Sequence, residues 1–100
     1  MPLVLTPSLR LVPAPDVFYT EIGDEAVVLN QVTGRYHGLD SVGTRIWSLL
    51  VVERRSLGET HAMLLREYEV TPDALWQDLT EFLNKVDELE LTTIQPPDVP

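Results

Sequence analysis

The sequence has 100 residues, of which 44% are hydrophobic; this share suffices for one packed core and argues against a disordered chain. Its formal net charge of −9 disfavours binding to the phosphates of nucleic acids or to an anionic membrane surface. The absence of cysteine excludes disulfides, thiolate nucleophiles and cysteine-based zinc sites. No basic segment opens the chain, and no apolar run approaches the roughly 20 residues needed to cross a bilayer, so we expect a cytoplasmic protein.

The two ends of the chain are rich in proline and are expected to be tails. Four prolines fall within residues 1–15, and proline cannot donate to a β-ladder, so residues 8–12 are expected to form at most a short extended piece. Leu9 and Leu11 are expected to pin this first tail to the core. Residues 92–100 contain three further prolines and are expected to form a loose tail, which leaves residues 16–91 as one domain.

Three short strands follow the first tail. Residues 17–22 are rich in β-branched and aromatic side chains, which favour strands. A turn at residues 23–25 leads to the apolar run 26–29, and a second turn that ends at Gly34 leads to residues 35–39. The pattern predicts an antiparallel meander with 26–29 in the middle. The third strand is then an open edge, where another chain can pair.

Within the third strand, side chains alternate between two faces. Tyr36 and Gly38 share one face, and Arg35, His37 and Leu39 share the other. Glycine weakens a strand, and its presence in one indicates that another group approaches closely. At Gly38 that group is either a helix of the core or a ligand, and the sequence leaves both possibilities open.

Three helices are predicted after the strands. Asp40 or Ser41 can cap the first, whose apolar residues recur at helical spacing through Leu50 and place Trp47 in the core. Residues 56–59 match a capping box and open the second helix, which runs to about Tyr68. Thr71 at the cap and Pro72 at the first helical position open the third, which runs to about Leu89.

The third helix has more apolar surface than one buried interface requires. Its main stripe has spacings of four and three, and it consists of Leu75, Leu79, Phe82, Val86 and Leu89. Trp76 and Leu83 lie beside this stripe, so the apolar arc exceeds about 100°. One face can therefore pack on the core while the other lines a groove. We expect Trp76 in the groove, with a place in the core as the alternative.

The order of these elements and their motifs resemble the PqqD-like family over residues 16–91. Members of this family are RiPP recognition elements, which bind leader sequences of ribosomally made peptides. The resemblance implies an α+β winged helix-turn-helix fold, in which a three-stranded antiparallel sheet is followed by three helices. It rests on Val28-Leu29, on the run from Thr33 to Asp40, on Gly43 with Ile46 to Leu50, on Tyr68 to Val70, on Asp78-Leu79 and on Phe82-Leu83.

The resemblance also implies where a leader would bind. The leader would add as a strand beside the third strand, in the groove between that strand and the third helix. Arg35 and Lys85 are candidates for contacts with acidic groups of the leader, although Lys85 is expected on the solvated surface. Carried over by position, the docking strand consists of Arg35, Tyr36, His37, Gly38 and Leu39, and the groove wall of Trp76, Leu79, Thr80 and Leu83.

The acidic, cysteine-free chain is most similar to the leader-binding protein of lasso-peptide biosynthesis. That similarity implies a protein without catalysis, cofactor or metal, which presents the leader to other proteins. Its partners would be the precursor-peptide leader and a leader peptidase of the transglutaminase-like cysteine protease type, with a cyclase as a further candidate. Within the same family, a peptide chaperone for pyrroloquinoline quinone biosynthesis is the alternative.

Two other classes of function fit the sequence poorly. Winged helices often bind DNA, but five acidic residues against Lys85 alone on the third helix would repel phosphates. An enzyme would need a nucleophile with its base, a metal cluster or a glycine-rich phosphate loop, and no such spacing is present. His61, the one histidine on a predicted helix, is expected to be a packing residue.

Overall fold

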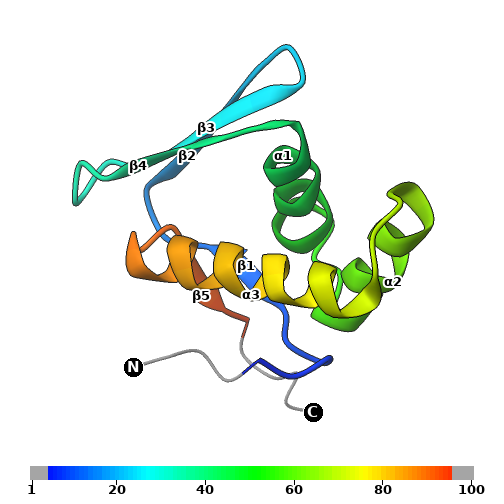
Figure 1. The fold of residues 1–100 in the computed structure, drawn as a ribbon. Coiled ribbons are helices and arrows are strands. Elements are labelled where there is room, and N and C mark those ends of the chain that lie inside the picture. The colour runs from blue at the N-terminus through cyan, green and yellow to red at the C-terminus, as the bar shows by residue number, and fades with distance from the viewer. Residues whose placement is uncertain (1–4, 96–100) are drawn as a thin grey trace.

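The structure is a computed structural model, and it describes residues 5–95. The predicted α+β fold, a three-stranded antiparallel sheet followed by three helices, is confirmed (Figure 1). Two short strands outside that sheet complete the molecule. In chain order the elements are β1 (Leu11–Pro13), β2 (Val17–Ile22), β3 (Glu25–Asn30), β4 (Tyr36–Leu39), α1 (Ser41–Trp47), the π-helical turn η1 (Ser48–Val52), α2 (Leu57–Glu67), α3 (Pro72–Glu88) and β5 (Thr92–Ile94).

The main sheet has the order β2-β3-β4, and both of its hairpins turn at a glycine. Gly23 and Gly34 have φ values of 66° and 75°, which residues with a side chain rarely adopt. The pairing places Tyr19, Val28 and His37 in one row on the inner face of the sheet. The next row on that face contains Ala26 and Leu39, both buried, so this face meets the helices.

The second hairpin is tied to the end of α3 by Asn30, a buried polar residue that is 5% exposed. Its Oδ1 accepts hydrogen bonds from the backbone N–H groups of Val32 (2.9 Å) and Thr33 (3.2 Å). Its Nδ2 donates to the carbonyl oxygen of Glu90 at 2.7 Å. One side chain thus forms the turn before β4 and fixes that turn against the segment that follows α3.

Both expected tails contribute a strand to the fold. β1 and β5 pair antiparallel, with Leu11 opposite Ile94 and Pro13 opposite Thr92. The expectation of a loose tail is therefore wrong for Thr92–Ile94, a β-branched run that the prolines at the chain end obscured; residues 96–100 lie outside the described part. The expected anchoring by Leu9 and Leu11 is confirmed, because both are buried.

The predicted helix starts are confirmed. Asp40 accepts a hydrogen bond from the Gly43 N–H at 2.7 Å, and the Thr71 hydroxyl accepts one from Ala74 at 3.2 Å. Ser56 and Glu59 form both hydrogen bonds of the capping box. The first helix differs from the expected single element, because the α-helix ends at Trp47 and continues as the π-helical turn η1.

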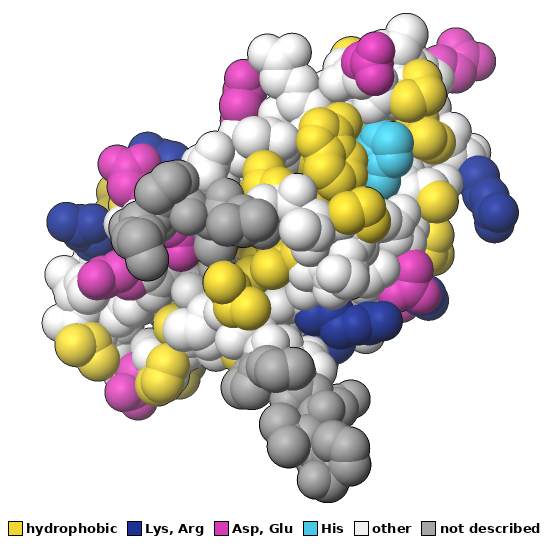
Figure 2. All heavy atoms as spheres, turned by 90° about the horizontal axis from the view of Figure 1, so that it is seen from below, with side chains coloured by type: hydrophobic (Ala, Val, Ile, Leu, Met, Phe, Trp, Pro, Cys, Tyr) yellow, Lys and Arg dark blue, Asp and Glu magenta, His cyan; other side chains and the backbone are white. Residues whose placement is uncertain are grey.

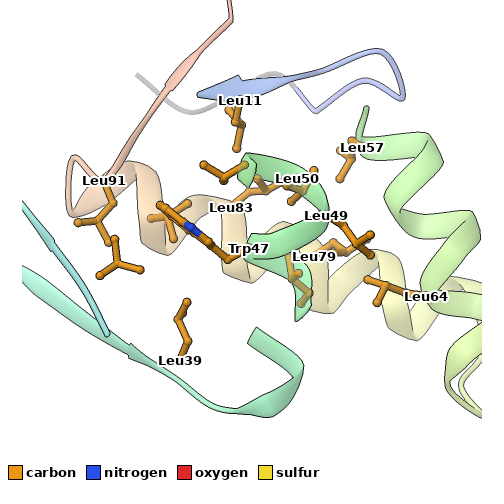
Figure 3. Packing of buried hydrophobic residues seen from close by; sticks show 14 of the residues in the cluster. Leu11, Leu39, Trp47, Leu49, Leu50, Leu57, Leu64, Leu79, Leu83 and Leu91 are labelled. Carbon is orange, nitrogen blue, oxygen red and sulfur yellow. The ribbon is translucent and has the colours of Figure 1, made fainter. Parts of the chain in front are cut away.

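One hydrophobic core joins the sheet to all three helices (Figure 3). Trp47 is fully buried and stacks on Tyr19 of β2 with the ring centroids 6.0 Å apart. Burial, and then a hydrogen bond to Glu21, raises the pKa of Tyr19 to about 12. The buried leucines of η1, α2 and α3 point toward the same interior in Figure 3.

We predict that Asn30→Ala destabilises the protein by about 2 kcal/mol, because it leaves backbone groups of the turn and of Glu90 without their partner. For a domain of this size, the thermal midpoint should fall by roughly 10 °C. Thermal unfolding followed by circular dichroism measures this shift. Asn84→Ala, at an exposed position of α3, is the control and should leave the midpoint nearly unchanged. Equal midpoints for the two variants would contradict the role given to Asn30.

Candidate functional site

β4 is an open edge of the main sheet: among the described residues it pairs with β3 alone. The Asn30 N–H donates to the Arg35 carbonyl oxygen at 2.9 Å, which makes these two residues a hydrogen-bonded pair. Hydrogen-bonded and non-hydrogen-bonded pairs alternate along an antiparallel ladder, so His37 and Leu39 also direct their backbone groups toward β3. The backbone N–H and C=O groups of Tyr36 and Gly38 therefore point outward from the edge.

A hollow of about 620 Å³ lies beside this edge, between β4, the start of α1 and one face of α3. Its floor is apolar, with Phe82 half-buried and Ile46 buried. Exposed charged side chains of α3 form its rim. The residues that line it are His37, Gly38 and Leu39 of β4, Asp40, Val42, Gly43 and Ile46 at α1, and Asp78, Glu81, Phe82 and Lys85 of α3.

The structure brings three of the five predicted strand residues to the hollow. His37, Gly38 and Leu39 line it, although the Leu39 side chain is also part of the core. Tyr36 is on the outer face, 68% exposed, in one row with Phe18 and Leu29. Arg35 lies just before β4, and its Nη1 donates to the Glu88 carbonyl oxygen at 3.0 Å, so it joins the strand to the end of α3.

Gly38 has open space where a side chain would begin, because no atom lies within 4 Å of a Cβ built there. The two possibilities left open by the sequence can therefore be separated for this structure. No element of the described fold packs against the outer side of Gly38. The close approach that a strand glycine allows is available to another molecule.

The four residues expected in the α3 wall do not line the hollow, and this expectation is corrected. Leu79 and Leu83 are fully buried in the core. Trp76 is half-buried and meets His61 of α2 edge-on, with the ring centroids 5.4 Å apart, and the Thr80 hydroxyl donates to the Trp76 carbonyl oxygen at 2.9 Å. On the face seen from below, hydrophobic side chains gather around a histidine (Figure 2).

The rotation of α3 about its axis explains why these four residues do not line the hollow. α3 buries Leu75, Leu79, Leu83 and Val86, at spacings of four, four and three. The buried stripe is thus rotated from the predicted one: Leu83 enters the core and Phe82 turns toward β4. The residues missed by the sequence interpretation are Asp78, Glu81 and Phe82 of α3, and Val42 and Ile46 of α1, whereas Lys85, a candidate for contact with the leader, does line the hollow. The recurrence of Asp78, Phe82 and Lys85 on one helical face is the pattern that would have indicated this wall.

Within residues 5–95, no three His, Cys, Asp or Glu side chains are grouped so that they could hold a metal ion. In the same residues, every helix is too short or too polar to span a bilayer. The hollow offers backbone hydrogen-bonding groups, an apolar floor and a few exposed charges. These are the features that hold an extended peptide.

Residues 25–91 match the family model described as Coenzyme PQQ synthesis protein D (PqqD). The chain belongs to the PqqD family. The matched segment runs from β3 past the end of α3, so it contains every residue that lines the hollow. Membership of this family agrees with the expectation that the chain binds a peptide and catalyses no reaction itself. No protein of curated function matches the sequence.

Two solved structures are similar to this PqqD-family chain. One is described as TbiB1 in complex with the TbiA(beta) leader peptide; it is 37% identical, with a TM-score of 0.76, and the match covers 86% of this chain and 98% of that one. The other is described as lasso peptide synthetase B1 complexed with the leader peptide; it is 21% identical, with a TM-score of 0.74 and the same coverage. The second likeness concerns the fold alone.

Proposed function

We propose that this protein binds the leader region of a ribosomally made precursor peptide, which adds as a strand to β4. The observation that carries the proposal is the outward-facing backbone of Tyr36 and Gly38 beside an apolar hollow. In strand addition, backbone hydrogen bonds give affinity and register, and pockets for alternate side chains give specificity. The leader complex of the 37% identical TbiB1 supports the choice of ligand.

The two parts of the site have separate tasks in this mechanism. The edge of β4 supplies N–H donors and C=O acceptors, and pairing with β3 already holds the backbone that carries them in an extended conformation. The hollow receives the leader side chains that point toward α3, and Phe82 with Val42 and Ile46 buries their apolar parts. Because the fold already holds the edge of β4 and the walls of the hollow in place, the protein loses little conformational entropy on binding.

We assign the leader to a lasso-peptide precursor, and the protein would present it to a leader peptidase of the transglutaminase-like cysteine protease type and to a cyclase. The resemblance of the sequence motifs to the leader-binding protein of lasso-peptide biosynthesis supports this choice, and the leader complex of the 37% identical TbiB1 agrees with it. The alternative is a peptide chaperone for pyrroloquinoline quinone biosynthesis, which the description of the family favours. The same groove would serve either role, so the ligand separates the two.

DNA binding is disfavoured by the position of α3. The face of α3 beside β4 exposes Asp78 and Glu81, and the neighbouring stripe that contains Leu79 and Leu83 is buried in the core. Carboxylates at this position would repel the phosphate backbone of a duplex.

The direct test is titration of the protein into a fluorescein-labelled leader peptide encoded beside its gene, followed by fluorescence anisotropy. We expect saturable binding with a Kd between nanomolar and micromolar, which corresponds to about −12 to −8 kcal/mol. A lasso-peptide leader should bind, and a pyrroloquinoline quinone precursor should not. Absence of saturation with any leader up to about 100 μM would reject leader binding.

Gly38→Pro should weaken leader binding at least about tenfold, because proline removes the N–H that points outward from the edge. Proline is tolerated on an edge strand where its nitrogen faces solvent, so the fold should persist. The matched control is Gly38→Ala, which keeps the N–H and places its Cβ in open space. Anisotropy should give an affinity close to that of the unchanged protein for the alanine variant. Similar affinities for both variants would show that the leader does not pair with β4.

Phe82 and Trp76 should differ in their effects because they lie on different faces of α3. Phe82→Ala removes the apolar floor of the hollow and should weaken leader binding by about 2 kcal/mol, roughly thirtyfold. Trp76→Ala removes packing against His61 and should lower the thermal midpoint while leaving the Kd within about threefold.

Anisotropy and thermal unfolding, measured on both variants, check this pair of expectations. Thr80→Ala, which is also on the Trp76 side, serves as a second control for binding. The opposite result, in which Trp76→Ala loses the leader and Phe82→Ala retains it, would place the leader on the other face of α3.

A further inference from the structure

The two ends of the hollow carry opposite charge. α3 and β4 run in opposite directions (Figure 1), and Arg35, just before β4, contacts the carbonyl oxygen of Glu88 at the end of α3. Lys85 lies toward this end of the hollow. β4 then leads to Asp40 and α1 at the other end, where Asp78 and Glu81 of α3 form the rim. Of the residues that line the hollow, the cation Lys85 is thus nearest the Arg35 end, and the carboxylates of Asp40 and Asp78 are toward the other end.

The charges of the α3 rim are available to a ligand. Asp78, Glu81 and Lys85 are exposed, and within the described part of the chain none of them forms an ion pair. The described ion pairs all use arginines at other places in the fold, such as Arg45 with Glu67 at 2.9 Å. Asp40 is occupied differently, because its carboxylate caps α1. The hollow is therefore lined by charges that no ion pair of the described fold occupies.

We propose that these charges select the bound peptide and fix which way it lies in the hollow. This inference rests on the proposed strand addition. The peptide places a basic side chain over Asp78 and Glu81, an apolar one over Phe82 and an acidic one over Lys85. The ligand class is therefore an extended peptide with opposite charges on one face and an apolar residue between them.

The spacing of the two elements determines the spacing in the peptide. Along α3, a rise of about 1.5 Å per residue separates Asp78 from Phe82 by roughly 6 Å and Phe82 from Lys85 by roughly 4.5 Å. Along a strand, residues on the same face are about 6.6 Å apart. Three alternate residues thus match the three positions of α3, which predicts opposite charges four residues apart. The basic residue comes first if the added strand is antiparallel to β4, and last if it is parallel.

The test is selection from a phage-display library of extended peptides with five consecutive random positions. It uses the unchanged protein and a variant with Asp78→Lys, Glu81→Lys and Lys85→Glu. The matched control is Gln77→Lys with Asn84→Lys, which has the same change of net charge at exposed positions outside the hollow. The unchanged protein and the control should enrich opposite charges four residues apart with an apolar residue between them, in one fixed order. The variant should enrich the reverse order.

Each exposed charge pair is expected to change affinity about two- to fivefold, and this preference should shrink at high salt. Enrichment without a charge pattern, or the same order on the unchanged protein and the charge-reversed variant, would overturn the inference. If peptides are enriched without the expected charge order and still lose binding to the Gly38→Pro variant, strand addition stands and only the charge selection fails. If nothing is enriched, or if Gly38→Pro has no effect on enriched peptides, the proposed function fails as well.

Discussion

The hydrogen bond from Asn30 Nδ2 to the Glu90 carbonyl oxygen is the contact on which the site depends. It joins the turn before β4 to the segment that follows α3, and β4 and α3 are the two elements that form the walls of the hollow. The Arg35 contact to Glu88 strengthens the same junction. At the other end, Asp40 ends β4 and caps α1 in one step. The edge strand is therefore held at both of its ends, while its outer side stays without a partner in the described fold.

Local sequence patterns were sufficient for the three strands of the main sheet, its turns and the helix starts. Gly34 requires a positive φ, the residues from Ser56 to Glu59 form a capping box, and Thr71-Pro72 starts a helix whatever the surroundings. Each of these features depends on groups within a few residues of one another. For the same reason the open edge was predictable, since a meander of three strands always leaves its third strand at the border.

The orientation of α3 was not predictable from its own residues. The apolar arc of α3 is wide enough for two rotations of the helix about its axis. One rotation buries Phe82 and the other buries Leu83. The choice is made by packing against Trp47 and the inner face of the sheet, which are distant in sequence. The pairing of β1 with β5 was missed for a similar reason: its two strands are about 80 residues apart, as Leu11 and Ile94 show. Contacts between distant segments of this kind give little signal in the local sequence of either segment alone.

The pairing of β1 with β5 has a practical consequence for how the protein can be tethered. It gathers the first and last strands of the described chain into one ribbon, and neither strand contributes a residue to the hollow. A fluorescent protein, a surface linker or a second enzyme joined beyond either strand would therefore be anchored outside the groove. The pairing also has a mechanical effect: a force that pulls β1 and β5 apart would act on the hydrogen bonds between them before it acted on β4. The edge of β4 is therefore mechanically sheltered by the β1–β5 ribbon.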